Sequence, residues 1–315
     1  MGGALPFPHR PVLVEEVLGL LLTAADGIYV DGTVGSGGHS EAIGKRIDEK
    51  GRLICLDRDA EAIRISSERL STLGKTVIVT KARYSEIDDI LEGLDVDRVH
   101  GILLDLGMST FQLEHSGRGF SFSRDEHLDM RMDLDEELTA QHLINSLSGA
   151  ELEKILRRYG EERRARRIAK AIEEEREKGP IRSSLQLANL IQSIAPPSHR
   201  SRGRHPATRS FQALRIAVNR ELENLERFLE KAPSLILKGG RLVVLSYHSL
   251  EDRLVKRAMA GWETDCRCPP DLPVCRCGKE PLFRRLNKKG IKPSKEEIDD
   301  NPRARSATLR AAERI

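Results

Sequence analysis

One stretch decides the fold of this chain: Ile28-Tyr29-Val30-Asp31-Gly32-Thr33-Val34-Gly35-Ser36-Gly37-Gly38-His39-Ser40. A β-branched run leads into four glycines and then into helix-forming residues, so the stretch predicts a strand, a turn and a helix. Glycine permits a close backbone approach to a ligand, and the first amides of the following helix lack partners. We therefore predict a nucleotide cradle, with a plain strand-to-helix turn as the alternative. Ser40 replaces the third glycine of the dinucleotide fingerprint, which disfavours a nicotinamide-dependent oxidoreductase.

Length and charge indicate a chain of two domains with a polyanionic partner. The 315 residues suffice for two domains of ordinary size. The formal charge of +3 hides an uneven distribution, because 181–220 holds seven arginines and no acidic residue, whereas 125–137 is rich in acids. The acidic run lacks the glycine of a calcium loop, so we expect no metal site there. No apolar run has the length of a membrane span and no signal layout opens the sequence, so we expect a cytoplasmic protein.

Strand patterns recur at both ends of the chain. After the opening strand, the sequence predicts strands at 52–56, 76–80, 99–104 and 241–247, and a final pair at 282–286 and 306–311. Helical patterns separate them, at 12–22, 60–70 and 249–260 among others. This alternation predicts an α/β fold with a parallel sheet, helices on both faces and ligands at the carboxyl ends of the strands.

The alternation stops after Phe111, and 139–194 is helical throughout. We interpret this part as an inserted all-helical domain. A proline-punctuated basic loop follows, and then one return helix with an apolar stripe at Leu214, Val218, Leu222, Leu225 and Leu229, closed by Gly239-Gly240. The expected domains are therefore 1–112 and 215–315, which form the sheet, and 113–214, which is inserted.

Three side chains fall where a nucleotide would bind. Asp57 follows the second strand, twenty residues past Gly37, a spacing at which an acid meets ribose hydroxyls in such folds. Capping of the next helix is the alternative for Asp57. The ring of Tyr84 follows the third strand and is placed to pack on a base, and Asp105 ends the fourth strand.

With these residues in place, the chain resembles the class I S-adenosylmethionine methyltransferases, whose sheet is Rossmann-like. It resembles most closely the RsmH (MraW) family, which methylates N4 of a cytosine in bacterial 16S ribosomal RNA, near the decoding centre. The matching stretches span nearly the whole chain: 31–40 (DGTVGSGGHS), 101–109 (GILLDLGMS), 118–122 (RGFSF), 128–133 (LDMRMD), 205–215 (HPATRSFQALR), 246–253 (SYHSLEDR) and 301–306 (NPRARS). The resemblance implies S-adenosylmethionine as cofactor, with contacts at Gly37, Gly38, His39, Asp57, Tyr84, Asp105 and Gln112.

Methylation of a cytosine amine requires a group that accepts its proton, because the nitrogen lone pair is delocalised into the ring. Asp105 is the best-placed acceptor, although it could instead serve only the cofactor. Tyr247 and His248, at the end of the fifth strand, are further catalytic candidates. The extruded base also needs an aromatic platform. Phe120 and Phe122 are either that platform or part of the core.

The remaining candidates concern RNA and zinc. Arg200, Arg202, Arg204 and Arg209 suit an RNA backbone, with a solvated basic loop as the alternative. Cys266, Cys268, Cys275 and Cys277 offer four thiolates, enough for tetrahedral zinc, or they form a free-thiol loop. Disulfides are not expected in the cytosol.

Two further functions compete with methylation of small-subunit RNA. One is an amino methyltransferase that acts on DNA or on another RNA. The other is a ribosome-assembly factor that binds RNA and uses the nucleotide fold only structurally.

Overall fold

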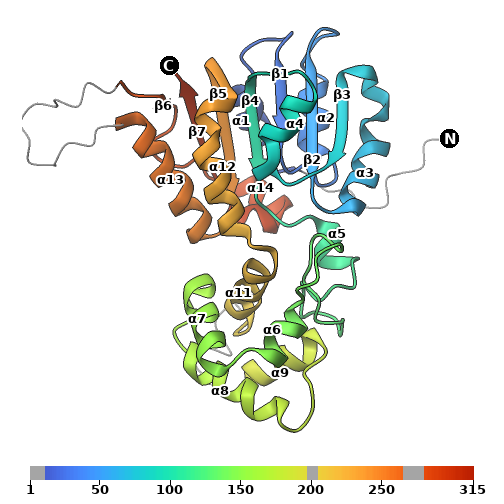
Figure 1. Cartoon of the computed structure of the whole chain (residues 1–315), viewed down its shortest axis with the longest axis vertical. Helices are drawn as coiled ribbons and strands as arrows, with labels where there is room; N and C mark the ends of the chain where they lie inside the picture. The colour runs from blue at the N-terminus through green and yellow to red at the C-terminus, as the bar shows by residue number, and fades with distance from the viewer. Residues whose placement is uncertain (1–10, 197–204, 265–279) are drawn as a thin grey trace, which may run out of the picture. The chain divides into compact units, whose positions relative to one another are not determined.

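The computed structural model describes residues 11–196, 205–264 and 280–315 (Figure 1). Two compact units make up the chain. Unit 1 comprises Met1–Gly107 and Leu222–Ile315, and unit 2 comprises Met108–Glu221. None of the helices in the described ranges is both long and apolar enough to cross a membrane.

A seven-stranded sheet forms the centre of unit 1 (Figure 1). Its strands, in spatial order, are β3 (Val77–Lys81), β2 (Arg52–Asp57), β1 (Ile28–Asp31), β4 (Val99–Asp105), β5 (Ile236–Ser246), β7 (Thr308–Arg314) and β6 (Phe283–Arg285). The strands from β3 to β5 are parallel, whereas β7 pairs antiparallel with both β5 and β6. The order 3-2-1-4-5 is that of a doubly wound sheet. The predicted α/β class is therefore confirmed.

Helices cover both faces of the sheet, because residues that alternate along each strand point to opposite faces. One face carries Val30, Ile54 and Ile102 and packs against α4 (Ile87–Gly93), α12 (Glu221–Leu235) and α13 (Ser249–Thr264). The other face carries Tyr29, Leu53 and Leu103 and packs against α1 (Val14–Leu21), α2 (Gly38–Gly44) and Leu70 at the end of α3 (Ala60–Leu70). Short elements complete the unit: η1 (Ser71–Thr76), η2 (Tyr84–Glu86), α14 (Lys295–Asp300) and η3 (Pro302–Ser306).

Helices form the regular structure of unit 2 within its described residues, 108–196 and 205–221. They are α5 (Thr110–Glu114), α6 (Ala140–Ser146), α7 (Gly149–Gly160), α8 (Ala165–Arg176), α9 (Ser184–Ser193) and α11 (Thr208–Asn219). Side-chain caps start several of them: Ser148 caps α7 in a reciprocal box with Glu151, and Thr139 and Ser183 cap α6 and α9. Their apolar faces meet in a separate core that includes Leu156, Ile168 and Leu214.

Two expectations about the return to the sheet were wrong. The single return helix is two helices, because Arg220 adopts a left-handed conformation (φ 49°) and separates α11 from α12. The apolar stripe is accordingly shared: Leu214 belongs to the core of unit 2 and Leu225 to that of unit 1. Gly239-Gly240 does not close a helix but lies inside β5, where a Cβ on Gly240 would come within 2.9 Å of the carbonyl oxygen of His100 on β4.

Candidate cofactor and catalytic site

The glycine stretch forms a tight turn between β1 and α2. Gly35 and Gly37 have positive φ values of 52° and 82°, which side chains rarely adopt. The N–H of Gly37 donates to the carbonyl of Val34 at 2.7 Å, and the N–H of Val34 donates to the carbonyl of Leu56 on β2 at 2.8 Å. The turn is thus held against the carboxyl end of the neighbouring strand, where a doubly wound sheet binds its ligand.

A buried polar cluster fixes the turn from beneath. The hydroxyl of Ser40 donates to the carboxylate of Asp31 at 2.6 Å, and the sulfur of Cys55 lies 3.2 Å from the same hydroxyl. All three side chains are buried. Burial raises the pKa of Asp31, although the hydrogen bond from Ser40 opposes this. Ser40 therefore has a structural reason to replace the third glycine, because it ties the start of α2 to the end of β1.

Asp57 links the cradle to the second strand. Its carboxylate accepts the N–H of Gly35 at 2.9 Å and the N–H of Asp59 at 2.9 Å. Burial raises its pKa to about 6. The helix cap that was an alternative for Asp57 is made by Asp59 instead, whose side chain accepts the N–H of Glu61 at 3.1 Å. The carboxylate of Asp57 is thus placed beside the cradle by its backbone bonds rather than used to start α3.

Tyr84 lies beside the cradle as well. It begins η2 shortly after β3, and its ring meets that of Phe228 edge-on, with centroids 5.9 Å apart. A Cβ on Gly32 would come within 2.9 Å of the Cβ of Tyr84, so the two backbones approach closely. Gly32 is needed for this approach, which brings an aromatic side chain to the same edge of the sheet as Asp57.

Asp105 lies between two candidate residues at the end of β4. The Nε2 atom of His39 on α2 is 3.5 Å from its carboxylate, and the hydroxyl of Tyr247 hydrogen-bonds to it from beyond β5. Its backbone N–H donates to the hydroxyl of Thr33 in the cradle at 2.6 Å. Burial raises the pKa of Tyr247 well above its usual value, and the negative charge of Asp105 adds to this effect. Tyr247 is therefore a neutral donor that orients the Asp105 carboxylate.

His39 has unused hydrogen-bonding capacity. Its side chain is only 6% exposed, yet neither ring nitrogen has a hydrogen-bond partner among the described residues. Buried polar atoms are normally satisfied, and an exception calls for an explanation. A ligand in the cradle supplies one. The unsatisfied imidazole, the positive-φ glycines and the Asp57 carboxylate together fit a nucleoside-bearing cofactor.

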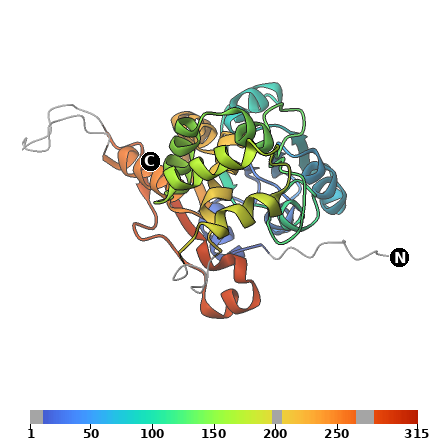
Figure 2. The ribbon, with the colours of Figure 1, turned by 90° about the horizontal axis from the view of Figure 1, so that it is seen from below.

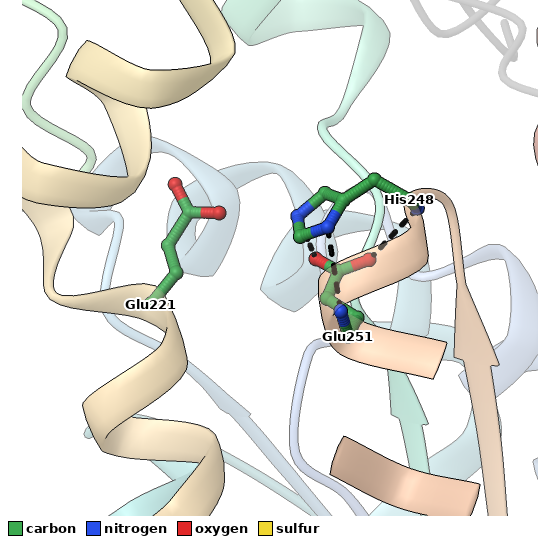
Figure 3. Close-up of side chains that lie close together, drawn as sticks. All are labelled: Glu221, His248 and Glu251. Carbon is green, nitrogen blue, oxygen red and sulfur yellow. Dashed lines mark hydrogen bonds and ion pairs between the residues drawn. The ribbon is translucent and has the colours of Figure 1, made fainter. Parts of the chain in front are cut away.

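His248 and Glu251 cap the start of α13 reciprocally (Figure 3). One oxygen of Glu251 accepts the N–H groups of Tyr247 at 2.9 Å and of His248 at 3.3 Å, and Nδ1 of His248 accepts the N–H of Glu251 at 3.4 Å. The other oxygen of Glu251 lies 3.0 Å from Nε2 of His248. Sequence reasoning missed Glu251, although a Glu three residues after the helix cap is a recognisable capping signal.

The lone pair of neutral His248 is engaged, because Nδ1 accepts the N–H of Glu251, whereas Nε2 lies 3.0 Å from the Glu251 carboxylate and has no hydrogen-bond partner among the described residues. A proton acceptor needs a free lone pair directed at the substrate. Asp105 is the stronger candidate on this ground. Glu221, the third side chain in Figure 3, belongs to unit 2, where its carboxylate forms two bonds of 2.8 and 2.7 Å with Arg215.

The candidates in unit 2 lie in its loop-rich start. Gln112 on α5 is 6% exposed, and its side chain accepts the N–H of Ser109, which completes a capping box. Phe120 is buried in the unit core. Phe122 is partly buried and stacks on His205 with centroids 4.5 Å apart. The faces of both phenylalanine rings are thus used, at least in part, for packing inside unit 2.

The proposed RNA and zinc residues are only partly described. Arg209 is exposed on α11, and its guanidinium donates to the carbonyl of Glu161 at 3.1 Å. Seven candidates lie outside the described residues: Arg200, Arg202 and Arg204, and four cysteines that we call the cysteine cluster, Cys266, Cys268, Cys275 and Cys277. Cys55, by contrast, is a buried free thiol under the cradle, and burial raises its pKa.

A family comparison matches residues 6–315, nearly the whole chain, to the MraW methylase family. The chain belongs to this family. Among relatives, Ribosomal RNA small subunit methyltransferase H of Caldicellulosiruptor bescii is 48% identical over 309 residues, which cover 98% of this chain and 100% of that protein. The protein of the same name from Syntrophobacter fumaroxidans is 48% identical, with 97% and 96% covered.

Membership of the MraW methylase family agrees with the sheet and its cradle. The fold is the class I methyltransferase fold, and S-adenosylmethionine is the cofactor. Among solved structures, fibrillarin from Aeropyrum pernix with bound S-adenosyl-L-methionine matches with a TM-score of 0.41 at 8% identity, over 95% of this chain and 72% of that one.

Proposed function

We propose that this chain transfers a methyl group from S-adenosylmethionine to the N4 amino group of a cytosine in 16S ribosomal RNA, near the decoding centre of the small subunit. Full-length relatives named Ribosomal RNA small subunit methyltransferase H support the RNA substrate. The observation that carries the chemistry is the placement of Asp105, between His39 of the cradle and the hydroxyl of Tyr247.

The cofactor would lie along the carboxyl ends of β1, β2 and β4. The backbone of Gly37 and Gly38 and the imidazole of His39 would contact it. The carboxylate of Asp57 would accept hydrogen bonds from the ribose hydroxyls. Tyr84 would cover the base. Gln112 is proposed on the family resemblance, since its side chain caps α5 in this structure. When bound, the cofactor supplies an electrophilic methyl group on a sulfonium.

The protein's own part in the reaction is orientation and proton removal. A positioned carboxylate that accepts an N–H of the amine draws electron density to the nitrogen and receives the proton as the new bond forms. Asp105 is proposed for this role, and Tyr247 holds its carboxylate by donating to it. Orientation of two reactants is worth about 7–11 kcal/mol of barrier in intramolecular models. His248 would act by shaping the Tyr247 segment rather than by taking the proton.

Arg200, Arg202, Arg204 and Arg209 are proposed to contact the RNA backbone. Arginine forms charge-assisted bonds with phosphate, and such contacts provide most of the affinity that does not depend on sequence. Of these four, Arg209 is described, and it is exposed. Any zinc at the cysteine cluster would have a separate structural role.

The test is methyl transfer by the purified protein with radiolabelled S-adenosylmethionine. Deproteinised 16S RNA, assembled small subunits and DNA of equal length are offered in parallel, and nucleosides are separated by mass spectrometry. We expect label in N4-methylcytosine from RNA or subunits and none from DNA. Label in DNA, or in another nucleoside, would overturn the substrate assignment. Asp105→Asn is the matched inactive control.

The assembly-factor alternative makes a different prediction. If binding alone mattered, a strain carrying Asp105→Asn would retain the cellular role of the protein. We expect that strain to lose N4-methylcytosine from its small-subunit RNA and to match a deletion strain. Mapping the methyl groups of ribosomal RNA from wild-type, variant and deletion cells distinguishes the two functions.

A further inference from the structure

The turn between α7 and α8 carries a dense group of arginines outside the residues discussed above. Residues 154–170 contain eight Lys and Arg against two acids, and one of these, Glu162, is buried and lies 3.5 Å from Arg164. Five arginines of the segment are exposed: Arg157, Arg158, Arg163, Arg166 and Arg167. We call these five, together with the exposed Arg209, the arginine turn.

Three helices bring the arginine turn together. α7 and α8 pack against each other, as Figure 1 and Figure 2 show, and a four-residue turn at 161–164 joins them. The start of α11 lies against the end of α7, because a Cβ on Gly160 would come within 2.6 Å of the carbonyl oxygen of Arg209. The guanidinium of Arg209 reaches back to the carbonyl of Glu161 at 3.1 Å. All of these contacts lie within unit 2.

The arginines of the turn differ in how far the fold uses them. Arg157 forms an ion pair of 2.8 Å with Glu153, and the guanidinium of Arg158 lies 5.3 Å from the ring centroid of Tyr159. By contrast, Arg163, Arg166 and Arg167 form no hydrogen bond or ion pair with the described residues. The segment 163–167 therefore presents three exposed guanidinium groups that can interact with solvent or with a ligand.

Helix stability does not account for Arg166 and Arg167. Cations stabilise the carboxyl end of a helix and destabilise its amino end. Arg157 and Arg158 occupy the last turn of α7, where they are favourable. Arg166 and Arg167 occupy the first turn of α8, which contains no acid, whereas the acids Glu173, Glu174 and Glu175 gather toward its other end. This distribution of charge is unfavourable for the helix, because the two arginines lie at the amino end, which already carries a partial positive charge.

We propose that the arginine turn is a phosphate-binding surface for the RNA substrate. The inference rests on the proposed function, because it assigns an RNA contact to an enzyme that acts on RNA. Exposed, unpaired guanidinium groups around a helix amino terminus attract phosphates and release counterions when they bind. Arg163, Arg166 and Arg167 are the central contacts, and Arg157, Arg158 and Arg209 form the rim.

The test compares two variants that lose the same charge. Arg163→Gln, Arg166→Gln and Arg167→Gln are combined in one protein. The control combines Arg227→Gln, Lys256→Gln and Arg257→Gln, three exposed cations of unit 1 that likewise form no ion pair with the described residues. The dissociation constant for deproteinised 16S RNA is measured at a series of potassium chloride concentrations. Calorimetry with S-adenosylhomocysteine reports that each variant is folded.

We expect the arginine-turn variant to bind RNA more weakly. The plot of log affinity against log salt concentration should become shallower by about 2, because each lost contact to single-stranded RNA reduces the magnitude of its slope by about 0.7. Its KM for RNA should rise while kcat stays unchanged. The control variant should keep the wild-type slope. The substitutions Arg163→Lys, Arg166→Lys and Arg167→Lys, made together, should restore the slope, because they retain the charge.

Equal slopes for the arginine-turn variant and the control would overturn the proposal while leaving the methyltransferase function intact. Absence of both RNA binding and methylation in the wild-type protein would instead overturn the proposed function and this inference with it. A variant that fails to bind S-adenosylhomocysteine is replaced by the single substitution Arg167→Gln, for which a loss of about 0.7 in slope is expected.

Discussion

The hydroxyl of Tyr247 hydrogen-bonds to the carboxylate of Asp105, across the carboxyl ends of two adjacent parallel strands. Asp105 is in register with Leu245, so Tyr247 lies two residues further along, on the same face. Gly107 makes the approach possible, because a Cβ there would come within 2.7 Å of the Tyr247 ring. The sheet thus joins two segments of the chain into one candidate catalytic unit.

Asp105→Asn should abolish methyl transfer and preserve the fold. The amide is similar in size but cannot accept the proton of the amine, and loss of a general base typically costs about 10²–10⁴ in rate. Single-turnover rates with 16S RNA measure the effect. A variant within tenfold of wild type would show that Asp105 serves only the cofactor.

Cofactor binding should weaken as the pH falls through about 6, because the pKa of Asp57 is raised to about 6 by burial. Ribose hydroxyls donate to the ionised carboxylate, so protonation competes with binding. The dissociation constant for S-adenosylhomocysteine should rise about tenfold for each pH unit below that value. Isothermal calorimetry on either side of this pH measures the dependence. Asp57→Asn should bind weakly at every pH, and an equally steep dependence in that variant would assign the titration to another group.

Gly107→Ala should destabilise the protein and slow the reaction. The added methyl group meets the Tyr247 ring, and overpacking of this kind costs about 1–3 kcal/mol. Gly93→Ala is the control, since a Cβ at the end of α4 meets nothing within 4 Å. Thermal unfolding and kcat are measured for both. Equal stability of the two variants would mean that the ring of Tyr247 moves aside freely.

His248→Asn should retain activity, whereas His248→Ala should lose stability. Asn is a good helix cap and can replace the bond that Nδ1 accepts from the Glu251 N–H, while loss of a cap costs about 1 kcal/mol. Denaturant unfolding and methyl transfer are compared for the two variants. If the Asn variant were stable but inactive, His248 would be the group that accepts the proton of the amine.

Glu251→Ala should affect Tyr247 as well as α13. Glu251 is 3% exposed and accepts the backbone N–H groups of both Tyr247 and His248. Leaving buried donors unsatisfied costs about 1–3 kcal/mol. We expect lower stability and a lower kcat with an unchanged dissociation constant for S-adenosylhomocysteine. A loss of cofactor binding equal to the loss of kcat would indicate a general disturbance instead.

Much of unit 1 could be predicted because its signals are local. Strands β1, β2 and β4 appear as continuous apolar runs, and the glycines between Asp31 and His39 mark the turn without reference to any partner. The error about the single return helix has a clear cause. The stripe from Leu214 to Leu229 keeps its helical period across Arg220, although its two halves pack in different cores.

The sequence by itself determined the α/β class, the cradle and the family, because periodicity, glycine chemistry and motifs are carried by neighbouring residues. Only the tertiary structure decided which buried groups meet. Strand pairing brings Tyr247 to Asp105, and the packing of α2 brings Ser40 into contact with Asp31 and Cys55. Contacts of this kind join residues far apart in the chain, and burial strengthens them in a way that no local pattern records.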